Sequence, residues 1–164
     1  MIEILILAAL VVAVLFGFVL MFGAPYLPTL SPQIKTALDL VDLQPGQHLI
    51  ELGCGDGKVL IDAAERGARV TGYELNPLLA FIAWARTRRF KNNVKVVWGN
   101  FWRRRLPLTD VVFVFLLPKY MPKLDKKITQ EYSGSNVKLV SIAFKIQYKK
   151  PKKIENGVFL YEYK

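Results

Sequence analysis

The sequence predicts an α/β protein in which a mostly parallel β-sheet follows a single membrane-spanning helix. Two observations lead to this prediction. Residues 1–34 contain one charged residue, Glu3, whereas the remainder holds all 23 basic residues and 12 of the 13 acidic ones. After residue 34, apolar runs of strand length alternate with segments of helical spacing, a pattern typical of parallel strands joined by crossover helices.

The apolar head is expected to be a membrane anchor over residues 1–24. From Ile4 to Ala24 no side chain is charged or forms hydrogen bonds, and these 21 residues span about 31 Å as a helix, close to the thickness of the hydrocarbon core. A basic start and a small-residue cleavage site are missing, which favours an uncleaved helix. A buried core helix or a monotopic segment is the alternative. Because the basic residues follow the head, the positive-inside rule places the rest of the chain in the cytoplasm.

Residues 25–34 are expected to form a stiff, extended connector, and residues 35–164 the globular domain. The connector holds three prolines, each of which fixes its own φ and biases the preceding residue away from helix. A short helix at about 31–41 leads into the turn at Pro45-Gly46, after which an apolar strand is expected at 48–52.

The rest of the domain continues the alternation. A segment at 58–66 has apolar residues at helical spacing and stops before Gly67. The almost wholly apolar run 110–117 suits a strand covered on both faces. The remaining expected elements are strands at 69–74, 94–98, 137–144 and 157–163, the last antiparallel at an edge, and helices at 77–89 and about 121–131.

A glycine-rich loop follows the first strand, at the edge of a parallel sheet where ligands bind. It reads Glu51-Leu52-Gly53-Cys54-Gly55-Asp56-Gly57-Lys58. Glycines at alternate positions let a ligand approach the backbone, beside the free N–H groups of the next helix. Lys58 occupies the position where a dinucleotide fingerprint needs its last glycine, which disfavours NAD and FAD. An ordinary turn is the alternative interpretation.

Two other strand ends carry candidate ligand-binding residues. Glu74 ends the second strand about 20 residues after the glycine loop, where a carboxylate can accept hydrogen bonds from both hydroxyls of a ribose. The third strand ends in Gly99-Asn100-Phe101-Trp102, in which an amide beside aromatic rings can bind a purine. The alternatives are a solvated surface glutamate and an aromatic edge of the core.

Together, ELGCGDG, GYELNP and the GN pair resemble the motifs of the class I S-adenosyl-L-methionine-dependent methyltransferases. The resemblance implies a Rossmann-like sheet and S-adenosylmethionine as cofactor. It implies that the glycine loop lines the methionine end of the cofactor, that Glu74 binds the ribose and that Asn100 and Phe101 flank the adenine. The cofactor-binding residues so implied are Glu51, Gly53, Cys54, Gly55, Asp56, Gly57, Glu74, Leu75, Asn100 and Phe101. The resemblance also implies that Cys54 fills a variable position between two glycines, which disfavours a nucleophilic role for it.

Over almost the whole chain, the apolar head, the APYLP connector and the segment VVFVFLLPKYMPKLDKKI are similar to the membrane-anchored protein-lysine methyltransferases of mitochondria, which modify the c-subunit of ATP synthase and the adenine nucleotide carrier, and to their prokaryotic relatives. This resemblance implies methylation of a lysine in a membrane-associated protein. The chain has Glu-Leu-Gly-Cys where those enzymes tend to have Asp-Leu-Gly-Ser. The head lacks an Arg-rich presequence, which favours a prokaryotic plasma membrane over the mitochondrial inner membrane.

Tyr120 is the candidate catalytic residue. A lysine acceptor must be aligned and must lose its proton, which a tyrosine or carboxylate can take or pass to water. Leu117-Pro118-Lys119-Tyr120 follows the fourth strand, where the acceptor channel is expected to open. The segment lacks the amide or acid with which amino-purine methyltransferases hold their base, and this disfavours base methylation. A surface-packed tyrosine is the alternative.

The basic clusters are compatible with nucleic acid, but a domain tethered at a membrane already faces anionic headgroups. Lipid and a membrane-protein substrate are therefore the expected partners; no oligomeric state is indicated. No metal site is expected, because His48 has no partner ligands at suitable spacing. The alternative functions are methylation of RNA, a lipid or a small molecule, and a non-catalytic, cofactor-binding membrane adaptor.

Overall fold

The computed structural model describes residues 1–7, 9–10, 13, 17 and 29–164. More than half of the predicted anchor, and residues 25–28 of the predicted connector, lie outside these residues. Residues 2–7 are helical. Within the described ranges, no helix has both the length and the apolar composition needed to cross a bilayer.

A seven-stranded sheet forms the centre of the domain, in the order β3-β2-β1-β4-β5-β7-β6. The first five strands are parallel, and β7 runs antiparallel to both β5 and β6. The chain order reverses between β1 and β4, which makes the carboxyl ends of these strands the topological switch point. The strands are β1 (His48–Leu52), β2 (Arg69–Glu74), β3 (Val94–Trp98), β4 (Val111–Val114), β5 (Val137–Ile142), β6 (Lys153–Glu155) and β7 (Val158–Tyr163).

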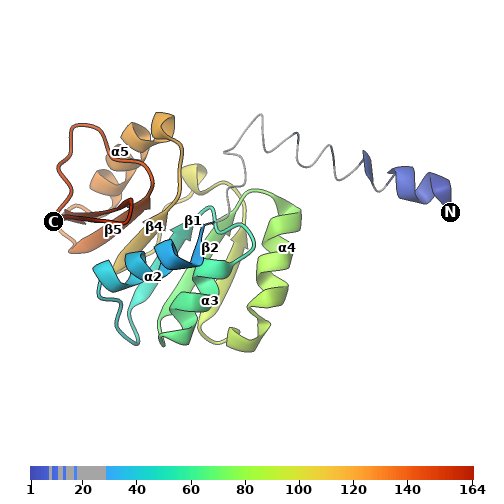
Figure 1. The fold of residues 1–164 in the computed structure, drawn as a ribbon, viewed down its shortest axis with the longest axis horizontal. Helices are drawn as coiled ribbons and strands as arrows, with labels where there is room; N and C mark the ends of the chain where they lie inside the picture. The colour runs from blue at the N-terminus through green and yellow to red at the C-terminus, as the bar shows by residue number, and fades with distance from the viewer. Residues whose placement is uncertain (8, 11–12, 14–16, 18–28) are drawn as a thin grey trace.

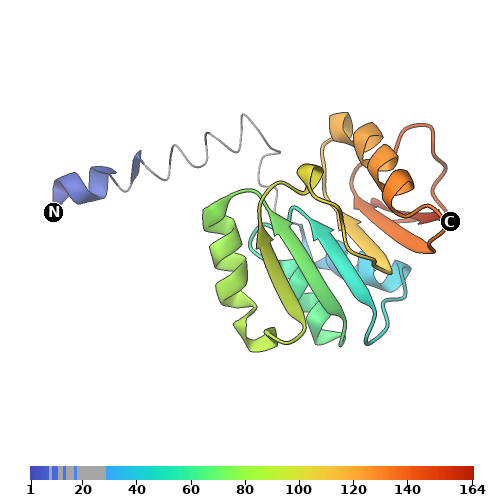
Figure 2. The ribbon, with the colours of Figure 1, turned by 180° about the vertical axis from the view of Figure 1, so that it is seen from behind.

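Helices cover the two faces of the sheet unequally. Figure 1 shows α2, α3 and α4 side by side on one face, and Figure 2 shows α5 on the other face beside β4 and β5. On that second face no helix in the described part of the chain lies over β2 and β3. The helices are α2 (Ser31–Leu40), α3 (Lys58–Glu65), α4 (Pro77–Arg86) and α5 (Met121–Glu131), with 3₁₀ turns η1 (Arg88–Phe90), η2 (Phe101–Arg103) and η3 (Pro118–Tyr120).

Two apolar cores lie on the two faces of the sheet. The first packs α2, α3 and α4 against the sheet, and in it Ile34 and Leu38 of α2 share a cluster with Val158 and Leu160 of β7. The second packs α5 against the alternate residues of the central strands. Because both faces of β4 are covered, all four of its side chains are buried, as its apolar run predicts.

The predicted α/β class, parallel sheet and antiparallel final strand are confirmed, with corrections at four places. The fourth strand stops at Val114 because both of its neighbours stop pairing there, β1 at the start of the glycine loop. The helix predicted to reach Arg89 ends at Arg86 and continues as the 3₁₀ turn η1. The fifth strand ends before Ala143, whose φ is 63°. The final strand is not at the edge, since β6 pairs with its outer side.

Candidate functional site

The loop between β1 and α3 lies at the switch point in an unusual backbone conformation. Gly53, Gly55 and Gly57 have φ values of 92°, 52° and 83°, a region that side chains disfavour. The amides of Gly53 and Cys54 both donate to the carbonyl of Tyr73 on β2, each at 2.9 Å. A Cβ on Gly57 would lie 3.1 Å from the Cβ of Ala83, so glycine here also lets the loop approach α4. The loop is thereby held against β2 with its backbone open to a ligand.

Glu74 lies directly against this loop. Its Oε2 accepts a hydrogen bond from the Gly55 amide and its Oε1 accepts one from the Asn76 amide, both at 2.8 Å. The side chain is buried, and burial raises the pKa of the carboxyl although these amide bonds lower it. A carboxylate offers about four lone-pair positions, so each oxygen keeps one for a ribose hydroxyl. The structure thus brings together the two sequence motifs expected to meet.

Glu51, on β1 below the loop, is buried and incompletely paired. Among the described residues its Oε2 has no hydrogen-bond partner. Burial raises the pKa of this carboxyl well above its ordinary value, and the charges of Glu74, Asp56 and Asp62 raise it further. A buried carboxylate without a partner is costly. The site is therefore electrostatically suited to a cationic ligand group.

The Cys54 side chain is buried and the Asp56 carboxylate is held in an ion pair, so both contribute to the structure of the loop. Burial raises the pKa of the Cys54 thiol, so it is protonated at neutral pH and is not a nucleophilic thiolate. A Cβ on Gly72 would lie 2.8 Å from its sulfur, so this strand glycine provides the space for the cysteine. The Asp56 carboxylate forms an ion pair with Arg86, which also donates to the Asp56 carbonyl at 3.0 Å. Asp56 thus joins the loop to α4.

The residues that follow β3 add aromatic side chains to the same edge of the sheet, at the carboxyl ends of the strands. Asn100 accepts a hydrogen bond from the Trp102 amide at 2.9 Å through its Oδ1 and so starts η2. The ring centroids of Phe101 and Trp102 are 4.5 Å apart. Leu75, after β2, accepts a hydrogen bond from the indole nitrogen of Trp98 at 3.1 Å through its carbonyl. These predicted residues therefore occupy neighbouring strand ends.

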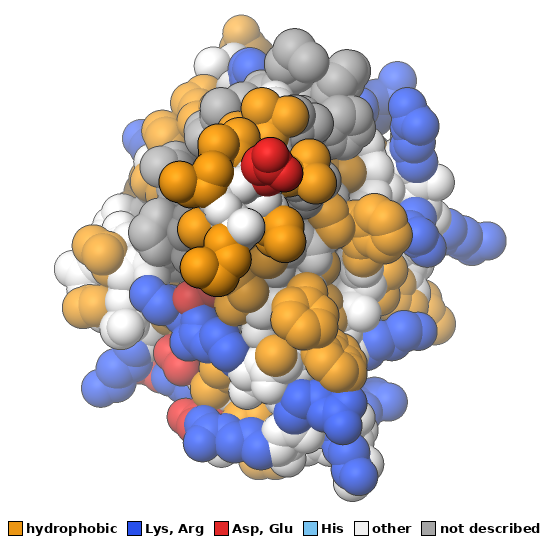
Figure 3. All heavy atoms as spheres, turned by 90° about the vertical axis from the view of Figure 1, so that its right-hand side faces the viewer, with side chains coloured by type: hydrophobic (Ala, Val, Ile, Leu, Met, Phe, Trp, Pro, Cys, Tyr) orange, Lys and Arg blue, Asp and Glu red, His pale blue; other side chains and the backbone are white. Residues whose placement is uncertain are grey.

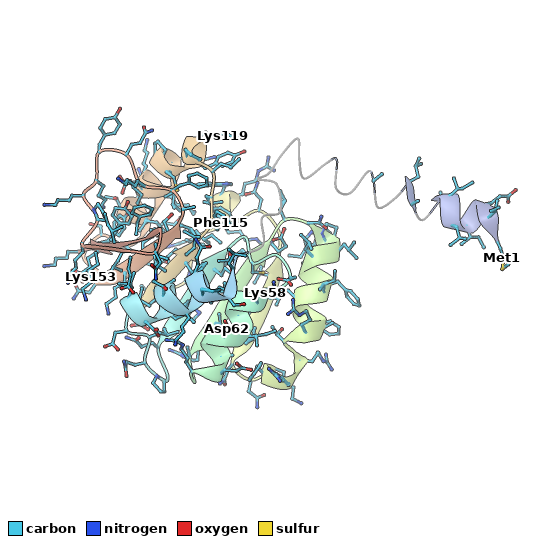
Figure 4. All side chains as sticks on the ribbon, viewed as in Figure 1. Met1, Lys58, Asp62, Phe115, Lys119 and Lys153 are labelled. Carbon is cyan, nitrogen blue, oxygen red and sulfur yellow. The ribbon has the colours of Figure 1, made fainter. Side chains whose placement is uncertain are left out.

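Tyr120 extends this aromatic cluster from the other side of the switch point. It lies in η3 on the segment that leaves β4, along which Phe115 and Lys119 are found (Figure 4). Its ring centroid is 6.3 Å from that of Trp102. The Nζ atoms of Lys119 and Lys123 lie 5.0 Å and 4.6 Å from the ring centroids of Tyr120 and Trp102, respectively. The cluster already holds two ammonium groups by cation–π contact.

Gly72, Arg86 and Lys123 contribute to the site but were not identified as candidates from sequence. A glycine inside a strand pattern indicates a close approach of another group, which gives a signal for Gly72. The partners of Arg86 and Lys123 depend on how α4 and α5 pack, which local spacing does not specify.

Comparison with known proteins decides the family. Residues 51–153 match the family model described as the ANTKMT methyltransferase domain. The chain belongs to this methyltransferase family. The domain has the class I methyltransferase fold.

Relatives of this methyltransferase domain include proteins of different length. It is 32% identical over 111 residues to the ATP synthase C-subunit lysine N-methyltransferase of Xenopus laevis, covering 65% of this chain and 48% of that protein. The chain therefore spans about half the length of that relative. It is 30% identical over 151 residues to a protein-lysine N-methyltransferase of Saccharolobus islandicus, covering 84% of this chain and 92% of that protein. The crystal structure of an RNA methyltransferase from Salinibacter ruber in complex with S-adenosyl-L-homocysteine is similar, with a TM-score of 0.76, 27% identity, and coverage of 84% of this chain and 92% of that one.

The cofactor of the methyltransferase domain is S-adenosylmethionine, and the residues present fit it. The unpartnered oxygen of Glu51 suits the ammonium group of the methionine part. The remaining lone pairs of Glu74 suit the ribose hydroxyls. The open space above Gly53, where a Cβ would meet nothing within 4 Å, leaves the loop backbone accessible to the cofactor.

Replacing Glu51 with glutamine is expected to stabilise the cofactor-free protein by about 1–3 kcal/mol at pH values above the ordinary pKa of 4.5, because the buried carboxyl must there either keep an incompletely paired charge or take up a proton on folding. The folded-state pKa of Glu51 lies above the ordinary 4.5. The stability contribution of wild-type Glu51 is therefore complete below pH 4.5 and is lost as the pH rises towards the folded-state pKa. The advantage of glutamine should accordingly grow with pH in thermal unfolding of the full chain.

The same substitution is expected to weaken binding of S-adenosyl-L-homocysteine by about tenfold or more, since the ammonium group loses its charged partner. Glu155→Gln, at an exposed position on β6, is the matched control and should change neither quantity. Equal stability of the Glu51→Gln and wild-type proteins at every pH would contradict the description of Glu51 as a buried, incompletely paired carboxyl.

Proposed function

We propose that this chain is an S-adenosylmethionine-dependent protein-lysine N-methyltransferase that acts on a membrane-associated protein. The observation that carries the proposal is the Glu74 carboxylate, held by the amides of Gly55 and Asn76, beside the Glu51 Oε2, which has no partner among the described residues. The similarity of this chain to the protein-lysine N-methyltransferase of Saccharolobus islandicus extends over 92% of the length of that protein. Membership of the methyltransferase family supports methyl transfer as the reaction. The relatives that are named as lysine N-methyltransferases support lysine as the acceptor.

When bound, S-adenosylmethionine supplies an electrophilic methyl group on a sulfonium. The protein must align an acceptor amine with that methyl group and keep the amine unprotonated. The half-buried Trp102 and Tyr120 have ring faces that suit an ammonium group, and their contacts with Lys123 and Lys119 support this role. Removal of water around the incoming lysine lowers its pKa, and the Tyr120 hydroxyl is the group that orients it or takes its proton.

We also infer that the protein works at the cytoplasmic side of a membrane, as a single-pass protein anchored by residues 1–24. The uncharged stretch from Ile4 to Ala24 supports this placement. The outer face of α4 supports it too, since Phe81 and Trp84 are 61% and 46% exposed and the Arg88 guanidinium lies 4.6 Å from the Trp84 ring centroid. Figure 3 shows this side of the molecule, where large hydrophobic side chains lie among Lys and Arg. Exposed aromatic rings with basic neighbours are typical of surfaces at lipid headgroups, so anionic lipid is the proposed partner.

Transfer of a tritiated methyl group from the cofactor into membranes tests the function. Membranes from cells that lack the gene are incubated with the full chain, and the products are treated with protease or RNase. We expect protein-bound label that protease removes, with methyl-lysine found by mass spectrometry. Glu74→Ala should abolish this label. Label that survives protease would contradict protein methylation.

Methylation of RNA is the second candidate, favoured by one observation. The similar solved structure from Salinibacter ruber is described as an RNA methyltransferase. In the same experiment, label that RNase removes and protease leaves would identify this activity.

A further inference from the structure

A polar cavity lies at the amino ends of β1, β2 and β3, on the sheet face that α5 only partly covers. Parallel pairing places His48 opposite Arg69, and Thr71 opposite Lys95. Because side chains alternate along a strand, these four share the face on which Tyr73 joins the α5 core. No helix in the described chain covers β2 and β3 on this face (Figure 2), and a cavity of about 240 Å³ lies there.

The basic side chains of this cavity lack acidic partners. Arg69, Lys91 and Lys95 line it, together with the amide side chains of Asn92 and Asn93. In the described structure neither lysine side chain forms a hydrogen bond or an ion pair, and the Arg69 side chain donates only to the Gly46 carbonyl, at 3.3 Å. By contrast, Arg66, Arg86 and Arg89 are each paired with a carboxylate.

The floor of the cavity is a fixed polar pair. The two ring nitrogens of His48 lie 2.9 Å from the Leu108 carbonyl oxygen and 2.9 Å from the Thr71 hydroxyl. A carbonyl oxygen only accepts, so Nδ1 carries the proton and donates to Leu108. The nearby Asp110 carboxylate accepts a hydrogen bond from the His48 amide at 2.7 Å. It does not belong to the residues that line the cavity.

We propose that this cavity binds the phosphate group of a small ligand, either a phosphomonoester or a diphosphate. Three cations without carboxylate partners match a compact group with two or more negative charges. No Phe, Tyr or Trp is among the described lining residues, and the one ring, that of His48, is held by hydrogen bonds at both of its nitrogens. The cavity therefore lacks the series of aromatic rings on which successive bases of a single-stranded nucleic acid stack. The ligand is therefore a terminal phosphate, carried by a soluble compound or by a lipid headgroup.

The phosphate site is separate from the methyltransferase site. Arg69 begins β2 and Glu74 ends it, and five steps along a strand amount to roughly 17 Å. The proposal therefore does not depend on the proposed function. Loss of phosphate binding with intact binding of S-adenosyl-L-homocysteine would concern this cavity alone.

Calorimetric titration of the full chain in detergent with inorganic pyrophosphate tests the proposal. We expect saturable binding that becomes at least about tenfold weaker in Lys91→Gln and in Lys95→Gln, and weaker still in the double variant, because each removes a charged hydrogen-bond donor. The matched control is the double variant Lys126→Gln/Lys150→Gln, which removes the same charge from exposed positions elsewhere. Binding of S-adenosyl-L-homocysteine shows that each variant is folded.

The origin of the phosphate is resolved by repeating the titration with the chain in bilayers. If a lipid headgroup is the ligand, phosphatidic acid bilayers should weaken pyrophosphate binding relative to phosphatidylserine bilayers. If the ligand is soluble, both bilayers should give the same affinity. The proposal is overturned if pyrophosphate does not bind, if the control variant loses as much affinity as the cavity variants, or if an RNA without terminal phosphates displaces pyrophosphate.

Discussion

Replacing Glu74 with alanine is expected to weaken binding of S-adenosyl-L-homocysteine by at least about 100-fold. Each hydrogen bond between a ribose hydroxyl and a carboxylate contributes about 1.5–3 kcal/mol, and the substitution removes both. It also leaves the buried amides of Gly55 and Asn76 without their acceptor, so the loop loses its support. Calorimetric titration of the full chain measures the loss directly.

Glu74→Gln separates the loss of hydrogen bonds to the ribose from the loss of an acceptor for the Gly55 and Asn76 amides. Glutamine keeps one acceptor oxygen but turns an NH₂ group towards one of the two amides, so binding should be intermediate between wild type and alanine. Glu65→Gln is the matched control, because Glu65 is an exposed glutamate on α3 that pairs with Arg89. Unchanged affinity for S-adenosyl-L-homocysteine in Glu74→Ala would show that the Glu74 carboxylate does not bind the ribose. It would also remove the main support for the proposed function.

Replacing Tyr120 with phenylalanine is expected to lower kcat for lysine methylation by about 100-fold or more while cofactor affinity stays unchanged. General acid–base catalysis by a positioned side chain contributes about 10²–10⁴-fold. Phenylalanine keeps the ring next to Trp102 and the contact with Lys119, so only the hydroxyl is removed. Single-turnover transfer with saturating cofactor isolates the chemical step.

The control for Tyr120 is Tyr148→Phe, which removes a hydroxyl from a fully exposed side chain. A fall in the apparent affinity for the acceptor, with unchanged kcat, would assign Tyr120 to acceptor binding instead of proton handling. Wild-type kinetics in Tyr120→Phe would support the interpretation of this residue as a surface-packed aromatic.

The first three strands could be predicted from the sequence because their apolar residues and the turn residues that flank them are local signals. Apolar runs bounded by turn residues give β1, β2 and β3 at the bounds observed. β6 has no such signal, since all three of its side chains are exposed and it pairs only through its backbone with β7. Where β4 ends depends on where its neighbours stop pairing, which an apolar run does not reveal.

The meeting of Glu74 with the glycine loop could also be predicted, because carboxyl ends of adjacent parallel strands lie at one edge. The electrostatic state of the site could not. Glu51 lies inside a strand, and its missing hydrogen-bond partner becomes evident only when the surrounding groups are placed. The cavity at the opposite edge likewise depends on which sheet face the helices leave open, a property of packing and not of any single motif.

The shared core of α2 and β7 has a consequence for synthesis. Ile34 and Leu38 are made early, but Val158 and Leu160, which pack in the same cluster, leave the ribosome more than a hundred residues later. The nascent domain therefore cannot close its first core until nearly all of it has been translated. The apolar head emerges long before then, so it leaves the ribosome while the domain is still unfolded.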